Sequence, residues 1–272
     1  MAVTLERPAL AEAPIARVKA GGRTLRDDRL AVETPIAFIY NCESHAVMMA
    51  SPRDLTDFAI GFSISEGIVD AASDISAVVP GRKGPGVTLS ITIPDARAKL
   101  LGTRKRNMAG RTGCGLCGVA EIEQALRPLP DLPNSPDSPV ISSAAIARAL
   151  AALPEEQSLN REVGAVHAAA FAAADGTLLC VREDVGRHNA LDKLIGAAAR
   201  RGLDPRSGFV VVTSRCSMEM VQKTATFGCP VLVAVSAATS LAVELAEKCN
   251  LTVAAFARGD SYNLYSHPER IA

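Results

Sequence analysis

The chain has 272 residues, of which 48% are hydrophobic and 4% aromatic, so it can build one large core or two modest ones from aliphatic side chains. Lys and Arg together number 29, as do Asp and Glu, and this balance predicts no general affinity for nucleic acid or membrane. No apolar stretch approaches the roughly 20 residues of a membrane helix, and the start lacks the pattern of a secretory signal. We therefore expect a cytoplasmic protein whose seven cysteines are free thiols.

The first half of the chain is predicted to mix α and β structure. Residues 1–17 are expected to be a loose tail, and 18–102 a mixed α+β region. Within that region, 31–40 has the composition of a strand, and 51–67 begins with a capping serine and a first-turn proline that favour a helix. Residues 87–93 alternate apolar and polar side chains, as a half-buried strand does.

Two irregular segments follow. Residues 103–127 combine basic side chains, glycines and two cysteines, and end in a short predicted helix. Residues 128–140 are dense in proline and turn formers, so they are predicted to be a linker to an α/β domain over 141–272.

The second half alternates strands and helices. Strands are predicted at 177–182, 209–213, 231–235 and 251–256, and helices at 143–153, 189–201, 218–227 and 240–248. This alternation implies right-handed crossovers and a mainly parallel sheet.

Polar residues gather directly after each of these four strands. In an open α/β sheet, ligands bind beyond the carboxyl ends of the strands, and helix N-termini there favour anions. Arg187, Arg215 and Arg258 add donors suited to phosphate, beside His188 and Ser217. In any one segment such residues are more simply helix caps, but four in succession favour a pocket for a large phosphorylated ligand. Neither a Walker motif nor G-x-G-x-x-G is present, which argues against ordinary ATP or NAD binding.

The only C-x-x-C of the chain is formed by Cys114 and Cys117. Its spacing alone fits a zinc half-site, a redox dithiol or a persulfide carrier equally well. Four nearby basic residues would favour the thiolate, and four glycines would let the segment swing between a donor and an acceptor; these are Arg104, Lys105, Arg106, Arg111, Gly110, Gly113, Gly115 and Gly118.

Several segments together resemble the FdhD family of formate dehydrogenase accessory sulfurtransferases, also called sulfur carrier proteins. The resemblance begins near residue 30 and rests on GFSISEGI (61–68), CGLCG (114–118), EDVGRHNALDKLIG (183–196), SRCSMEMVQK (214–223), SLAVELA (240–246), and FARG followed by YSHPER. The CGLCG motif alone would be weak, but together with EDVGRHNALDK the pattern is specific.

The resemblance implies a fold, a function and a site. It implies a cytidine-deaminase-like C-terminal domain, and a homodimer. The implied function is to take sulfur as a persulfide from a cysteine desulfurase and pass it to the molybdenum cofactor, bis-molybdopterin guanine dinucleotide, so that formate dehydrogenase becomes active. GDP-like nucleotides would mimic this ligand. The persulfide residue would be Cys114, assisted by Cys117, and the implied cofactor segment is Phe256, Ala257, Arg258, Gly259, Asp260 and Ser261.

Three positions limit what the resemblance implies. Ala165 and Ala238 stand where the family pattern has glycine and proline. These two differences affect the details of ligand binding that the resemblance implies, but not the class of protein. Zinc deaminases use H-x-E, yet His167 is followed by Ala169 at the glutamate position, and we therefore expect no metal site. Two alternatives stay open: a cofactor-binding chaperone that moves no sulfur, and a thiol oxidoreductase.

Overall fold

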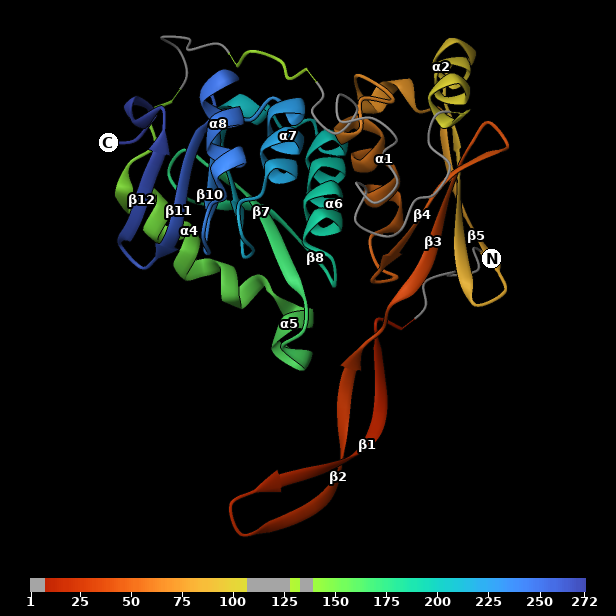
Figure 1. The fold of residues 1–272 in the computed structure, drawn as a ribbon, viewed down its shortest axis with the longest axis vertical. Helices are drawn as coiled ribbons and strands as arrows, with labels where there is room; N and C mark the ends of the chain where they lie inside the picture. The colour runs from red at the N-terminus through yellow and green to blue at the C-terminus, as the bar shows by residue number, and fades with distance from the viewer. Residues whose placement is uncertain (1–7, 107–127, 133–138) are drawn as a thin grey trace.

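The computed structural model describes residues 8–106, 128–132 and 139–272, and Figure 1 shows their arrangement. These residues form separate β-sheets of two, four and six strands, with helices packed between and over the larger two. Among the helices of this described part, none is long and apolar enough to span a membrane.

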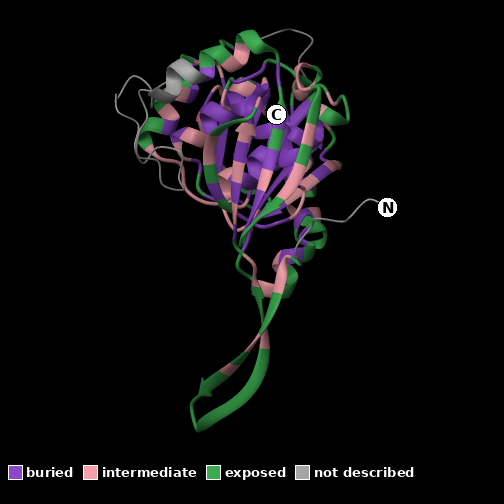
Figure 2. Cartoon of the chain, turned by 90° about the vertical axis from the view of Figure 1, so that its right-hand side faces the viewer, coloured by how far each residue is buried: buried purple, intermediate pink, exposed green. Residues whose placement is uncertain are grey.

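A two-stranded hairpin projects from the body of the molecule. Its strands are β1 (Leu10–Lys19) and β2 (Gly22–Ala31), which pair antiparallel along their whole length. A loose tail was expected over residues 1–17, but most of its described part lies in β1. The hairpin is nearly all exposed (Figure 2), so its residues lack the apolar alternation by which a half-buried strand is recognised.

The four-stranded sheet has the order β4-β3-β6-β5 and a mixed topology. Its elements, with the helices that accompany it, are β3 (Thr34–Tyr40), β4 (Glu43–Ala50), β5 (Ala77–Lys83), β6 (Gly86–Thr92), α1 (Leu55–Ser65), η1 (Ala72–Asp74) and α2 (Asp95–Arg106). Two strands and a helix were predicted here, and all three are present. The helix begins later than expected because Asp54 has a left-handed backbone with φ 53°, which delays the first turn to Leu55.

The six-stranded sheet has the order β12-β11-β10-β9-β7-β8. Its strands are β7 (His167–Ala173), β8 (Leu178–Asp184), β9 (Gly208–Val212), β10 (Val231–Ala234), β11 (Thr252–Arg258) and β12 (Ser261–Ser266). The predicted mainly parallel sheet is wrong: β9, β10 and β11 are parallel, whereas β7 and β12 join antiparallel. The alanine-rich β7 and the largely exposed β12 carry little strand signal, and both were missed.

Helices cover both faces of this sheet. They are α4 (Ser143–Glu156), α5 (Ser158–Val163), α6 (Arg187–Arg200), α7 (Met218–Phe227), α8 (Ser240–Lys248) and the single turns η2 (Pro205–Ser207) and η3 (Pro268–Arg270). Helix α4 packs on one face through Ile146 and Ala149, while α6, α7 and α8 pack on the other. Helix α1 lies against α6 and carries the four-stranded sheet on its far side, as Figure 1 shows.

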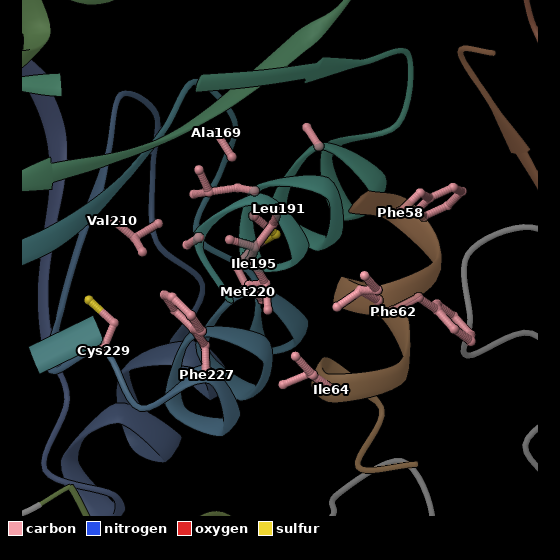
Figure 3. Close-up of a cluster of buried hydrophobic side chains, with 14 of the residues drawn as sticks. Phe58, Phe62, Ile64, Ala169, Leu191, Ile195, Val210, Met220, Phe227 and Cys229 are labelled. Atoms are coloured by element: carbon pink, nitrogen blue, oxygen red, sulfur yellow. The ribbon is translucent and has the colours of Figure 1, made fainter. Parts of the chain in front are cut away.

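One hydrophobic core runs through both halves of the chain. It extends from Phe38 in the four-stranded sheet, through Phe58 of α1 and Leu191 of α6, to Val210 in the six-stranded sheet. Figure 3 shows the part of this core from Phe58 to Val210. The regions predicted as 18–102 and 141–272 therefore share a core, although different sheets build them.

Glycines let α1 and α6 approach each other closely. A Cβ atom added to Gly61 would lie 1.6 Å from the backbone oxygen of Asp192, and one added to Gly196 would lie 1.9 Å from that of Asp57. The two helix backbones are thus in direct contact, so α6 is fixed rigidly between α1 and the six-stranded sheet.

Candidate functional site

The carboxyl ends of four strands meet along one edge of the six-stranded sheet. Strands β9, β10 and β11 are parallel, and β8 runs in the same direction because β8 and β9 are both antiparallel to the strand between them, β7. The polar segments that follow these strands therefore share an edge, as predicted, even though the sheet is mixed. The strand β7 begins at the same edge, where His167 pairs with Asp184.

Backbone hydrogen bonds join the segments that follow β9, β10 and β11. The amide of Cys216 donates to the carbonyl of Ala237 at 2.9 Å, and the amide of Thr239 donates to the carbonyl of Cys216 at 3.0 Å. The amide of Phe256 donates to the carbonyl of Ser236 at 3.0 Å. The edge is thus a connected surface rather than a set of separate loops.

Three helices begin at this edge without a side-chain cap. The N-cap residue of α6 is Gly186, which has no side chain to cap with. The N-cap residues of α7 and α8 are Ser217 and Thr239, and neither side chain accepts a hydrogen bond from its helix. Free N–H groups at a helix N-terminus, together with the helix dipole, favour negatively charged groups. The edge therefore offers several places suited to phosphate oxygens.

Buried donors lie between the first turns of α6 and α7. Within the described residues, Nε of Arg187, Nε2 of His188 and Oγ of Ser217 are buried without a hydrogen-bond partner. The Nε2 of His188 is 3.8 Å from Oε2 of Glu219, which is beyond a hydrogen bond but close enough for a charge interaction. Buried polar atoms are normally paired, and these three would find partners in a ligand with several acceptor oxygens.

The local charges set the protonation of two groups here. The neighbouring His188 lowers the pKa of Glu219 to about 2, against the opposing effect of burial, so Glu219 is ionised at neutral pH. Burial and the charges of Arg187 and His188 lower the pKa of His167, so its ring is neutral. Arg187 carries a permanent positive charge at this part of the edge, which suits phosphate binding.

A buried carboxylate holds the start of α6 in place. The two oxygens of Asp184 accept hydrogen bonds from the amide of Gly186 at 2.8 Å, the side-chain amide of Asn189 at 2.9 Å and the amide of Ser51 at 2.9 Å. Nζ of Lys193 lies 2.6 Å from the same carboxylate, and both side chains are fully buried. This network fixes the turn that presents Arg187 and His188, and it ties that turn to the β4–α1 connection.

The predicted cofactor segment, Phe256 to Ser261, is the tip of the β11–β12 hairpin. Arg258 pairs with Ser261 across a turn in which Gly259 has a φ of 59°. Phe256 also has a positive φ, of 55°, and 45% of its surface is exposed. Four strand spacings separate this tip from the end of β8, or roughly 19 Å at about 4.8 Å per strand. The structure places the two groups of predicted residues on one edge but far apart, which suits an extended ligand.

The predicted thiol pair, Cys114 and Cys117, lies outside the described residues. Four of the other cysteines are buried free thiols, and Cys42 is exposed. Burial raises the pKa of Cys216 to about 12, so this residue contributes its backbone to the edge and not a reactive thiolate. In the described part of the chain, no cluster of His, Cys, Asp and Glu side chains has the makings of a metal site.

Sequence reasoning assigned no role to three residues that shape the site, namely Asp184, Lys193 and Glu219. The available signal was the spacing of Asn189 and Lys193, which places both on one face of α6. The burial of this face and the carboxylate of Asp184 opposite it follow only from the tertiary packing of α6 against β8 and α1.

Comparisons with known proteins identify the family to which this chain belongs. A model of the FdhD/NarQ family matches residues 31–272. A protein named sulfur carrier protein FdhD from Bordetella petrii is 47% identical over 263 residues, covering 96% of this chain and 94% of its own. Another of that name, from Xanthomonas euvesicatoria pv. vesicatoria, is 49% identical over 265 residues, covering 97% of this chain and 93% of its own.

A solved structure shares the fold. The crystal structure of a protein from Desulfotalea psychrophila, described as a formate dehydrogenase accessory protein, superposes with a TM-score of 0.74 at 24% identity. The match covers 97% of this chain and all of the other. With a family model that spans nine tenths of the sequence and relatives of nearly half identity, this chain belongs to the FdhD/NarQ family.

Proposed function

We propose that this protein is a sulfur carrier that matures formate dehydrogenase. It accepts sulfur from a cysteine desulfurase at Cys114 and passes it to the molybdenum cofactor, bis-molybdopterin guanine dinucleotide. The near-half identity to proteins named sulfur carrier protein FdhD supports the first part. The second part is carried by one observation, the edge of the six-stranded sheet with its three uncapped helices.

The uptake of sulfur is a redox-neutral exchange. The thiolate of Cys114 attacks the terminal sulfur of the persulfide on the donor, the S–S bond of the donor breaks, and the donor leaves as a thiolate. Cys114 then carries the persulfide, and Cys117 assists its release. Because each sulfur is received and handed on, the protein acts as a relay and not as an independent metabolic enzyme. Reduced thiols are required, which fits a cytoplasmic location.

The edge of the sheet would hold the cofactor as a substrate. Arg187, His188 and Ser217 would bind phosphate oxygens at the α6 and α7 end, and Arg215 would add charge between them. The hairpin tip with Arg258 would hold the other end of the ligand, roughly 19 Å away by strand spacing. A dinucleotide with two pterins is long enough to contact both the α6 and α7 end of the edge and the hairpin tip.

Sulfur uptake can be tested by mass spectrometry of peptides. The protein is incubated with a cysteine desulfurase and cysteine without reducing agent, then digested. We expect one added sulfur on the peptide that contains Cys114 and Cys117, and none in the Cys114→Ala variant. Cys42→Ala is the matched control, since Cys42 is exposed and free, and it should keep the adduct. If Cys114→Ala takes up no sulfur but still activates formate dehydrogenase fully, the protein is a cofactor-binding chaperone that moves no sulfur.

Ligand binding can be tested with GDP by calorimetry. Arg258→Ala should weaken GDP binding about tenfold, because a charge-assisted hydrogen bond is lost. Arg206→Ala is the control, since Arg206 precedes β9 and so lies at the opposite edge of the sheet. Equal affinities of the wild type and Arg258→Ala would place the nucleotide elsewhere.

A further inference from the structure

One carboxylate stands among the unpaired donors between α6 and α7. Oε2 of Glu219 is 3.8 Å from Nε2 of His188, and the side chains of these two residues are 19% and 12% exposed. Within the part of the chain that the structure describes, Nε2 of His188 and Oγ of Ser217 make no hydrogen bond. The carboxylate therefore balances the charge of this cluster without being fixed in it by a close contact to the histidine.

The same carboxylate lies at the free end of α7. Glu219 is in the first turn of this helix, and the side chain of the N-cap residue, Ser217, accepts no hydrogen bond there. His188 lowers the pKa of Glu219 to about 2 against the effect of burial, and Ser217 and the amide of Glu219 itself act in the same direction. A negative charge is favourable at a helix N-terminus because of the helix dipole. Glu219 thus fills, with its own charge, a place that suits an anion.

Two other carboxylates next to the start of α6 have fixed partners. Glu183 accepts hydrogen bonds from two backbone amides of α5, both at 2.8 Å, and so caps that helix. Asp184 is fully buried and lies 2.6 Å from Nζ of Lys193. Neither can leave its place without breaking these contacts. Glu219 has a long, flexible side chain that already reaches water, so its carboxylate can turn outward.

We propose that Glu219 is a resident counter-ion that a phosphate group of the ligand displaces. In the free protein its carboxylate balances His188 and the N-terminus of α7. In the complex a phosphate takes this place, Glu219 turns into solvent, and no covalent bond changes. The ligand then gains only the difference between its own interactions and those that the carboxylate gives up. This inference rests on the proposed binding of a phosphorylated cofactor and states how that binding is kept reversible.

A protein that hands its cargo on needs such a limit on affinity. The buried donors and the N-termini of α6, α7 and α8 would hold a phosphorylated ligand tightly if nothing opposed them. A phosphate carries more charge and more acceptor oxygens than a carboxylate, so it can replace Glu219 when the ligand arrives. Affinity differences between related complexes lie mostly in the dissociation rate. We therefore expect Glu219 to act mainly by speeding release.

Removal of the charge should tighten binding. The full chain is titrated by calorimetry with GDP and, separately, with inorganic pyrophosphate. Glu219→Gln keeps the shape of the side chain and should bind both at least about tenfold more tightly, because no charge has to be displaced. Glu219→Ala should also bind more tightly than the wild type. Glu244→Gln is the matched control, since it removes an exposed carboxylate from α8, and its affinities should stay within about twofold of the wild type.

The dissociation rate gives a second measurement. A fluorescent GDP analogue should leave Glu219→Gln at least about fivefold more slowly than the wild type in stopped-flow experiments. Unchanged binding by both Glu219 variants would overturn the proposal, and weaker binding would do so by showing that Glu219 orients His188 for the ligand. An equal gain in Glu244→Gln would overturn it as well, since the effect would then be one of net charge.

The two probes separate this inference from the proposed function. A wild type that binds pyrophosphate but not GDP would refute the nucleotide ligand, while the displacement of Glu219 would still be decided by the pyrophosphate titrations. A wild type that binds GDP, with variants that bind it equally well, would refute the counter-ion and leave the proposed function standing. A wild type that binds neither probe would overturn both.

Discussion

The side chains that organise the carboxyl edge of the six-stranded sheet are charged and buried, and their partners lie on other elements of the fold. Asp184 at the end of β8 meets Lys193 of α6 and the backbone of Ser51 near α1. A second pair, Lys223 with Asp192, lies between α7 and α6, and Glu66, which directly follows α1, lies beside it. Burial alone would lower the pKa of Lys223, but these two carboxylates raise it, so the lysine stays charged. Such pairs fix the relative positions of helices more than they add to stability.

Removal of one buried partner should be costly. Lys193→Met leaves the Asp184 carboxylate buried without its counter-charge, and we expect a loss of about 3–5 kcal/mol in the free energy of unfolding. Urea denaturation measures this loss. Lys248→Met, at an exposed position in the last turn of α8, should change stability by less than about 0.5 kcal/mol. Similar values for the two variants would show that the Asp184 pair contributes little.

The stability of the fold should fall when His167 is forced to take up a proton. Its folded pKa lies below the usual 6.5 because of burial and the charges of Arg187 and His188. The unfolded chain therefore binds this proton more readily than the folded chain. The contribution of neutral His167 to the free energy of unfolding is present above about pH 6.5 and is lost as the pH falls below that value. His167→Gln removes the titration, so its unfolding midpoint should decrease less than that of the wild type between about pH 7 and pH 5. Parallel curves for the two proteins would contradict this.

The sequence predicted which residues lie at the edge better than it predicted what supports them. Arg187, His188 and Ser217 could be placed because each follows a strand whose end is visible in the apolar pattern. Lys193 could not be assigned a partner, because the opposite carboxylate is nine residues earlier on another element and only the tertiary packing brings them together. The thiols Cys114 and Cys117 lie outside the described residues, and their role stays a prediction.

At the scale of elements, the sequence correctly predicted the regular helices but missed the less apolar strands. The bounds of α7 and α8 agree with the prediction, because an apolar stripe and a clear start or stop mark each helix. Strand β7 is mostly alanine, which has no strand preference, and only its place between β8 and β9 makes it a strand. The close contact of α1 with α6 was also invisible, since a glycine in a sequence does not reveal which backbone approaches it.

That contact should tolerate no side chain. In Gly61→Ala or Gly196→Ala, the new Cβ would overlap a backbone carbonyl of the other helix, and a backbone cannot move aside as a flexible side chain can. We expect each variant to lose at least about 2–3 kcal/mol in the free energy of unfolding, as overpacked cores do. Gly22→Ala is a suitable control, because nothing lies within 4 Å of its added Cβ. A wild-type unfolding midpoint for both helix variants would refute the backbone contact.

At the scale of the whole molecule, two regions that look like separate domains in the sequence behave as one. The proline-rich segment predicted as a linker, 128–140, suggests a division, and the two larger sheets are indeed built from opposite sides of it. The hydrophobic core nevertheless continues from one to the other through α1 and α6. Composition marks where a chain turns and breaks, but it does not show which faces later pack together.

A shared core predicts a single unfolding transition. The four-stranded sheet packs its inner face against α1, and α1 in turn packs on α6, so neither half can unfold without exposing the other. Circular dichroism and the fluorescence of the three tyrosines should report coincident urea transitions, because Tyr40 lies in one half and Tyr262 and Tyr265 lie in the other. Two separate transitions would mean that the halves are independent domains.

The meeting of Gly61 with Gly196 also constrains how the gene can be divided or recombined. A fragment that ends in the proline-rich segment would contain α1 and would expose to water the face of α1 that packs on α6. The complementary fragment would contain α6 and would expose the face of α6 that packs on α1. Each alone should be insoluble, whereas the two produced together should reassemble through that face. For the same reason, chimaeras made between relatives should succeed only when both helices come from the same parent.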